Sequence, residues 1–136
     1  MKQERVFVNA PEAVATARRY VAGQLRDVPR AVVDEIAIMV SELATNCIRH
    51  TTSDFSIAVD AGRSRIVVEV TDRGSGTPNV RSPGPQEPSG RGLLIVRELS
   101  DSFGFRELPG APGKTVWFAV ELDHRSPERT GSEATA

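Results

Sequence analysis

Two polar side chains, one helical turn apart, could handle a metal-bound phosphate. Glu42 and Asn46 lie four residues apart within Arg30–His50, and at about 100° per residue they project within about 40° of each other. An amide oxygen beside a carboxylate suits Mg²⁺, which takes one or two protein oxygens and leaves its other positions to water and phosphates. The pair could instead belong to a solvated polar stripe, and both interpretations are open at this point.

An aspartate and two glycines follow a predicted strand, in the run Asp72-Arg73-Gly74-Ser75-Gly76. Asp72 could accept a hydrogen bond from an exocyclic amine. Gly74 and Gly76 would let a flat ring approach the backbone, because neither carries a Cβ. The alternative is a tight turn in which Asp72 accepts backbone N–H groups and the glycines supply positive φ.

A second glycine motif, Gly90-Arg91-Gly92, comes directly before a short predicted helix, Leu93–Leu99. Free N–H groups at a helix start, with no Cβ at either glycine, suit a phosphate. A simple hinge is the alternative. The segment before it, residues 77–89, carries four prolines and no periodicity, and a loop of this length in a small domain is more often functional than incidental.

Other motifs lack the context that their chemistry requires. Gly113-Lys114-Thr115 resembles the end of a phosphate-binding P-loop, but Leu108 stands where the first glycine belongs, and a strand rather than a helix follows. The single cysteine, Cys47, lies on an apolar stripe and is predicted to pack in the core. Together with the two histidines it shows no metal-ligand spacing.

The elements that would position these groups follow from the spacing of apolar residues. Recurrence every three or four residues predicts helices, and strict alternation predicts strands. The predicted order is a strand Glu4–Val8, a helix capped by Asn9 and running to Val28, a helix Arg30–His50, strands Phe55–Val59 and Ile66–Val70, a helix Leu93–Leu99, and strands Ser102–Leu108 and Lys114–Leu122. This order predicts an α+β two-layer sandwich, with a mixed, mostly antiparallel sheet covered on one face by helices.

Length and composition limit the class of protein. The chain has 136 residues, of which 39% are hydrophobic, and 17 basic against 18 acidic residues give a net charge of -1. This predicts one domain over residues 1–122, with a disordered polar tail at 123–136. Balanced charge argues against direct nucleic-acid binding, and no apolar run suggests a membrane span or a signal peptide. A cytoplasmic location is therefore expected.

Taken in order, these motifs resemble those of the GHKL ATPases, which have the Bergerat ATP-binding fold. The segments that carry the resemblance are Ser41-Glu42-Leu43-Ala44-Thr45-Asn46, the Asp72 motif, the proline-rich segment, Gly90-Arg91-Gly92-Leu93 and the late Thr115 strand. Within that family the match is most similar to the bacterial anti-sigma-factor serine/threonine kinases, and it spans about Val6 to Leu122.

The resemblance implies a role for each motif. Glu42 would be the general base for a hydroxyl nucleophile, and Asn46 would ligate Mg²⁺ on the ATP phosphates. Asp72 would bond the adenine amino group, with Gly76 beside the ring, and Thr115 on the neighbouring strand would support either Asp72 or the adenine. The implied ATP-binding set is Asn46, Asp72, Gly74, Gly76, Gly90, Arg91, Gly92, Leu93 and Thr115, with residues 77–89 as a lid. Arg81 or Arg91 could contact the γ-phosphate or simply be solvated.

The same resemblance implies partners. The phosphorylated protein would be an anti-anti-sigma factor of the STAS fold, and the kinase would also sequester a sigma factor. A homodimer through the first helix or the sheet edge is possible. Two alternatives are a regulator in which ATP changes partner choice without phosphate transfer, and an interaction module that binds no nucleotide.

Overall fold

A computed structural model describes residues 2–74 and 88–122, with side chains from residue 93 onward in the second range. The predicted lid at 77–89 lies almost wholly outside these residues, as do Gly76, Arg81 and the tail at 123–136. The elements in chain order are β1 (Lys2–Phe7), α1 (Ala13–Gly23), α2 (Arg30–His50), β2 (Phe55–Ala61), β3 (Arg65–Asp72), α3 (Pro88–Leu99), β4 (Ser102–Glu107) and β5 (Lys114–Glu121).

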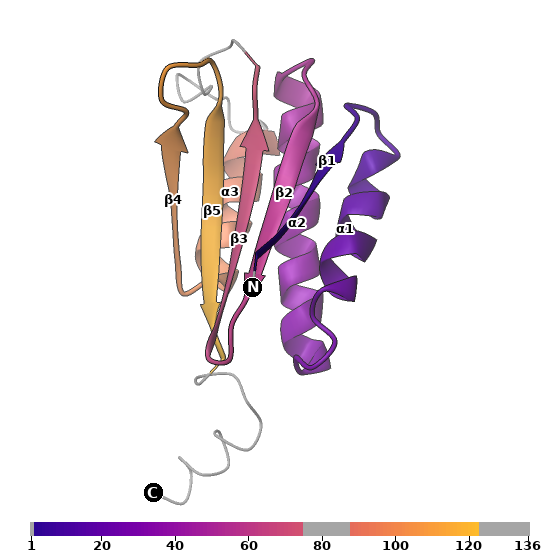
Figure 1. Cartoon of the computed structure of the whole chain (residues 1–136), viewed down its shortest axis with the longest axis vertical. Coiled ribbons are helices and arrows are strands. Elements are labelled where there is room, and N and C mark those ends of the chain that lie inside the picture. The colour runs from indigo at the N-terminus through magenta and orange to yellow at the C-terminus, as the bar shows by residue number, and fades with distance from the viewer. Residues whose placement is uncertain (1, 75–87, 123–136) are drawn as a thin grey trace, which may run out of the picture.

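The strands form one sheet, and the three helices cover one of its faces (Figure 1). The strand order is β1-β2-β3-β5-β4, and each of the four neighbouring pairs is antiparallel. The predicted α+β sandwich is confirmed, and the described sheet is antiparallel throughout rather than mixed. Alternation within β3 directs Ile66, Val68 and Val70 to the helices, and Asp72 continues that same face.

Helix α2 is the central helix of the second layer, because it contacts α1, α3 and β3. Its apolar stripe predicts burial, and its buried residues are Val32, Ile36, Met39, Val40, Leu43, Ala44 and Cys47. They pack against fully buried side chains of the sheet such as Phe55 and Phe118. This packing fixes the rotation of α2, and therefore the direction in which its polar residues project.

The N-terminal helix differs from the prediction. Helix α1 begins at Ala13 and ends at Gly23, although Leu25 beyond it is still buried. Asn9 is not its cap: its Nδ2 donates to the carbonyl oxygens of Thr51 at 3.1 Å and Ser53 at 2.9 Å. Asn9 therefore stabilises the segment after α2, where the last carbonyl groups of a helix lack partners within it.

Helix α3 also differs, because it begins at Pro88 rather than at Leu93. Proline suits the first turn of a helix, since its φ is already helical and its missing N–H would have had no partner there. Further along, Val96 is fully buried and anchors the helix in the core. Gly90 and Gly92 consequently lie inside α3 and not before it. No helix among the described residues is long and apolar enough to cross a membrane.

Candidate functional site

The predicted site residues gather at one end of the sheet. Helix α2 and strand β3 both end there, and α3 and β5 both begin there, at the upper end in Figure 1. The topology thus brings the last turns of α2, with Glu42 and Asn46, toward the same edge as Asp72.

Asn46 carries a buried side-chain oxygen. Its side chain is half-buried, and within the described part of the chain its Oδ1 accepts no hydrogen bond. An unsatisfied buried acceptor costs about 1–3 kcal/mol, so such a group needs an explanation, and a ligand is one. An amide oxygen is a suitable Mg²⁺ ligand. The residues present therefore fit the metal role that the resemblance implies for Asn46.

His50 lies one turn beyond Asn46 and was not among the predicted site residues. Its Nε2 is also buried without a hydrogen-bond partner in the described ranges. Glu42, Asn46 and His50 follow one another at four-residue spacing, so they form a polar stripe along α2. That spacing is the sequence signal that could have placed His50 in the site.

Asp72 ends β3 with its carboxylate turned toward the helix layer. It is 3% exposed. Its Oδ1 accepts the backbone N–H of Gly74 at 3.2 Å, and its Oδ2 lies 3.1 Å from Nζ of Lys114. As the tight-turn alternative predicted, one oxygen of Asp72 accepts a backbone N–H, but Gly74 does not have the positive φ that the same alternative predicted. Because each carboxylate oxygen has two lone pairs, Asp72 can still accept a further hydrogen bond.

Lys114, and not Thr115, supports Asp72. Lys114 stands opposite Asp72 in the β3–β5 ladder, whereas Thr115 stands opposite Thr71. The two threonine Oγ1 atoms lie 2.7 Å apart, on the sheet face away from Asp72, because successive side chains of a strand alternate in direction. The predicted contact of Thr115 with Asp72 is therefore wrong. Thr115 is one residue beyond the position opposite Asp72, and its side chain consequently lies on the other face of the sheet.

Gly74 joins the Asp72 turn to the end of α2. A Cβ on Gly74 would lie 2.8 Å from Cβ of Thr51, so this glycine permits close packing against the residue that follows α2. The N–H of Arg73 also donates to Oγ of Ser53 at 3.3 Å. The turn after β3 and the segment after α2 are thus braced against each other. Gly74 serves this packing in the structure, and its predicted place beside a flat ring stays a prediction.

Gly113 is predicted to be required for stability. Its φ is +120°, and an added Cβ would lie 2.3 Å from the carbonyl oxygen of Asp72. We expect Gly113→Ala to lower the free energy of unfolding by about 2–5 kcal/mol, from backbone strain and overpacking together. Gly110→Ala is the matched control, since Gly110 has φ +70° but open space around it. Equal losses in urea unfolding for the two variants would contradict the close contact.

Cys47 packs in the core beside the site, as predicted. Burial is the main cause that raises the pKa of its thiol to about 12; the negative charge of Asp72 raises it further, and Lys114 offsets part of the rise. Because both charged groups act on a side chain of α2, the ends of α2, β3 and β5 lie within electrostatic range of one another.

This thiol gives a pH-dependent prediction. Below about pH 9 both folded and unfolded chains hold the proton; between about pH 9 and 12 only the folded chain does. The unfolded state then binds fewer protons, so this group's contribution to stability is lost as pH rises, by about a tenfold increase in the unfolding constant per pH unit. Cys47→Ala should remove this part of the decrease in unfolding free energy with rising pH, measured by urea unfolding at a series of pH values. An unchanged slope between pH 9 and 11 would be the contrary result.

The backbone of the first turn of helix α3 lies at this end. Ser89 and Gly90 lie in its first turn, where N–H groups have no partner within the helix. Gly92 is the fifth residue of the helix, one turn beyond the first N–H groups that lack intrahelical partners. Leu93 packs against the hydrophobic core. The side chain of Arg91 lies outside the described atoms.

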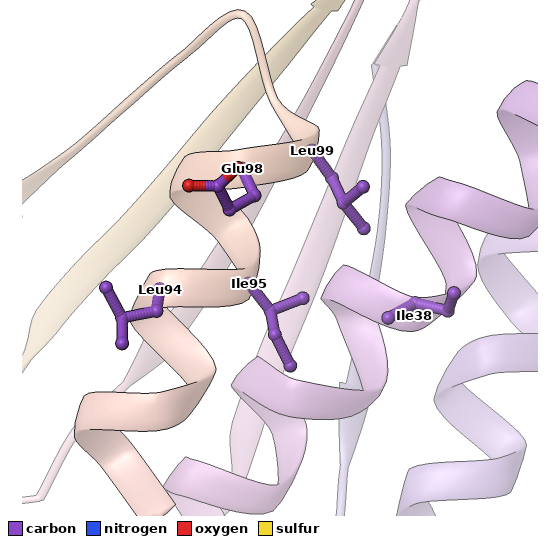
Figure 2. A pocket seen from close by; sticks show the side chains of 5 residues that line it. All are labelled: Ile38, Leu94, Ile95, Glu98 and Leu99. Atoms are coloured by element: carbon purple, nitrogen blue, oxygen red, sulfur yellow. The ribbon is translucent and has the colours of Figure 1, made fainter.

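An apolar groove between α2 and α3 was not predicted. Figure 2 shows Ile95 and Leu99 of α3 in the space next to Ile38 of α2, with Leu94 and Glu98 at the side. Ile38 is 48% and Leu94 56% exposed. Since Ile38 precedes Glu42 by four residues, the groove lies one helical turn from the polar stripe.

An antiparallel sheet with helices on one face, and with a buried carboxylate and an unsatisfied amide oxygen at one end, defines an α+β sandwich of the GHKL type. The family model for the histidine kinase-like ATPase domain matches residues 7–120. The chain belongs to this family, and the resemblance predicted from its motifs is confirmed at that level.

Solved structures of low identity share the fold. The RsbU and RsbW domains of Rv1364c from Mycobacterium tuberculosis match with a TM-score of 0.66 and 18% identity, over 90% of this chain and 32% of that one. The histidine kinase domain of a blue-light activated histidine kinase from Erythrobacter litoralis matches with a TM-score of 0.56 and 22% identity, over 85% of this chain and 60% of that one. Histidine kinase AdeS of Acinetobacter baumannii matches with a TM-score of 0.55 and 14% identity, over 89% of this chain and 68% of that one. The chain thus spans about a third to two thirds of these chains. No protein with a curated description matches it significantly.

Proposed function

We propose that this chain binds ATP with Mg²⁺ and transfers the γ-phosphoryl group to a serine or threonine hydroxyl of a partner protein, as a cytoplasmic anti-sigma factor. The observation that carries the proposal is the buried side-chain oxygen of Asn46, which has no hydrogen-bond partner among the described residues. Asn46 lies one turn from Glu42, at the end of the sheet where β3 ends with Asp72. Membership of the histidine kinase-like ATPase family supports nucleotide binding.

Different groups of the site would bind the metal, the phosphates and the base. Asn46 Oδ1 would hold Mg²⁺, which when bound neutralises phosphate charge. The free backbone N–H groups of Ser89 and Gly90 suit phosphate oxygens, since a helix N-terminus carries partial positive charge. Asp72 would accept the adenine amino group. Because phosphoryl transfer depends mainly on positioning and electrostatics, these groups supply what the reaction needs.

Glu42 would take the proton of the attacking hydroxyl. The hydroxyl oxygen forms a bond to the γ-phosphorus, the bond from that phosphorus to the ADP oxygen breaks, and the proton passes to the Glu42 carboxylate. A half-buried carboxylate on α2, one turn from the metal ligand, is placed to act on a nucleophile that approaches the terminal phosphate.

The partners follow from the resemblance. An anti-anti-sigma protein of the STAS fold would be phosphorylated, and a sigma factor would be sequestered. The M. tuberculosis structure contains an RsbW domain, and its likeness to this chain supports the fold shared by such regulators.

The test is transfer of label from γ-labelled ATP, with Mg²⁺, to STAS-fold proteins of the same organism. Label on a serine or threonine of one of them, together with ATP binding by calorimetry, is the expected result. ATP binding that changes partner affinity without label transfer would establish a non-catalytic switch instead. Absence of ATP and ADP binding at millimolar concentration would establish an interaction module and overturn the proposal.

A further inference from the structure

Lys114 is held directly beside the carboxylate proposed to contact the base. Its Nζ lies 3.1 Å from Oδ2 of Asp72, and the two side chains are 20% and 5% exposed. The preceding residue, Gly113, packs so closely on the backbone of Asp72 and Arg73 that a side chain there would clash. The ammonium and the carboxylate are therefore presented together, as a donor next to an acceptor.

We propose that Lys114 determines base specificity: its ammonium donates a hydrogen bond to a ring nitrogen that flanks the 6-amino group of adenine, while Asp72 accepts from that amino group. The inference rests on the proposed function, because it concerns how the same ATP site recognises the base. A lysine ammonium has three donors, and Asp72 takes one of them. Two donors remain to be directed toward a ligand.

Lys114 as donor and Asp72 as acceptor match the hydrogen-bonding groups of adenine but not those of hypoxanthine. Adenine presents its amino donor between two ring acceptors, N1 and N7. Hypoxanthine has a carbonyl oxygen in place of the amino group and an N–H at position one. Bound in the same orientation, it would set an oxygen against the Asp72 carboxylate, and an unpaired or repulsive contact of this kind is how sites reject the wrong ligand.

A lysine that only balanced the charge of Asp72 would behave differently. Taking an ammonium out of water is unfavourable, and a buried ion pair does not by itself stabilise a fold. Such a lysine would affect the binding of every ligand that contacts Asp72, whatever ring nitrogens that ligand carries. Sensitivity to a single ring nitrogen therefore separates direct contact from charge balance.

The experiment combines ligand and protein changes, with affinities measured by calorimetry in Mg²⁺. For the unmodified chain we expect 1-deaza-ATP or 7-deaza-ATP to bind about tenfold more weakly than ATP, since a hydrogen bond from a charged donor is lost. Lys114→Met should bind ATP about tenfold more weakly and should not distinguish ATP from that analogue. Lys2→Met, which changes the chain's other lysine on β1, should behave as the unmodified chain.

Each outcome decides a separate question. Equal binding of ATP and both analogues by the unmodified chain overturns the role of Lys114 but leaves the ATP site intact, and so does discrimination retained by Lys114→Met. No binding of ATP by the unmodified chain is the failure of the proposed function itself. Because Lys114→Met leaves Asp72 without its counter-charge, circular dichroism checks its folding. If it is unfolded, the analogue series on the unmodified chain decides alone.

Discussion

Glu42→Gln is expected to slow phosphoryl transfer to the partner protein by roughly 10²–10⁴-fold, the usual contribution of a positioned general base. Glutamine keeps the size and the hydrogen-bonding reach of the side chain, but its amide cannot take up the hydroxyl proton. Glu42 is half-buried on α2 and lies one turn before Asn46, so the change leaves the proposed metal ligand in place. Nucleotide affinity should therefore stay within about threefold of the parent.

Label transfer under single-turnover conditions measures the first quantity, and calorimetry with a non-hydrolysable ATP analogue measures the second. Asp34→Asn is the matched control, because it makes the same change of charge on the same helix. The side chain of Asp34 is 63% exposed and forms an ion pair with Arg30. Exposed ion pairs of this kind contribute little to the stability of a protein. Transfer by Glu42→Gln at the parental rate would show that Glu42 is not the base.

Asn46→Ala is expected to weaken Mg²⁺-dependent nucleotide binding by about 10- to 100-fold, the range that follows loss of a group supporting a metal site. The same change should leave the nucleotide-free chain as stable as the parent, or more stable by about 1 kcal/mol. Two physical reasons combine: an unsatisfied buried oxygen is removed, and alanine favours a helix more than asparagine does. Opposite effects on binding and on stability are the signature of a ligand-holding residue.

Titrations of a fluorescent ATP analogue in Mg²⁺ and in EDTA, with urea unfolding of the nucleotide-free chain, test this pair of effects. The difference between parent and Asn46→Ala should be large in Mg²⁺ and small in EDTA. A variant that binds the Mg²⁺ complex with parental affinity would contradict the metal role. Strong destabilisation without nucleotide would show that Asn46 makes a structural bond instead.

The elements governed by local periodicity could be predicted from the sequence. Helix α2 has the predicted bounds, Arg30–His50, because its apolar stripe runs over its whole length, and the β2–β3 hairpin follows from strict alternation. Asn9 could not be placed in this way. It resembles a helix cap, but its amide bonds Thr51 and Ser53, more than forty residues away, and local sequence holds no information about those partners.

Single residues of the candidate site could be predicted from the sequence, but the contacts between residues of different strands could not. The shared face of Glu42 and Asn46 follows from helix geometry, and the place of Asp72 follows from the end of a strand. Lys114 was missed because its position opposite Asp72 depends on the register between β3 and β5. The resemblance implied Thr115, one residue from the position that faces Asp72. A shift of one residue moves a side chain to the other face of the sheet.

The central claim is that magnesium-bound nucleotide occupies the end of the sheet where α2 and β3 finish. A crystal structure of the full chain with Mg²⁺ and a non-hydrolysable ATP analogue measures this directly. We predict the metal at about 2.1 Å from Oδ1 of Asn46, the usual Mg²⁺–oxygen distance, and the adenine amino group on the carboxylate of Asp72. Nucleotide bound at another surface, with Asn46 and Asp72 contacting only protein, would contradict it.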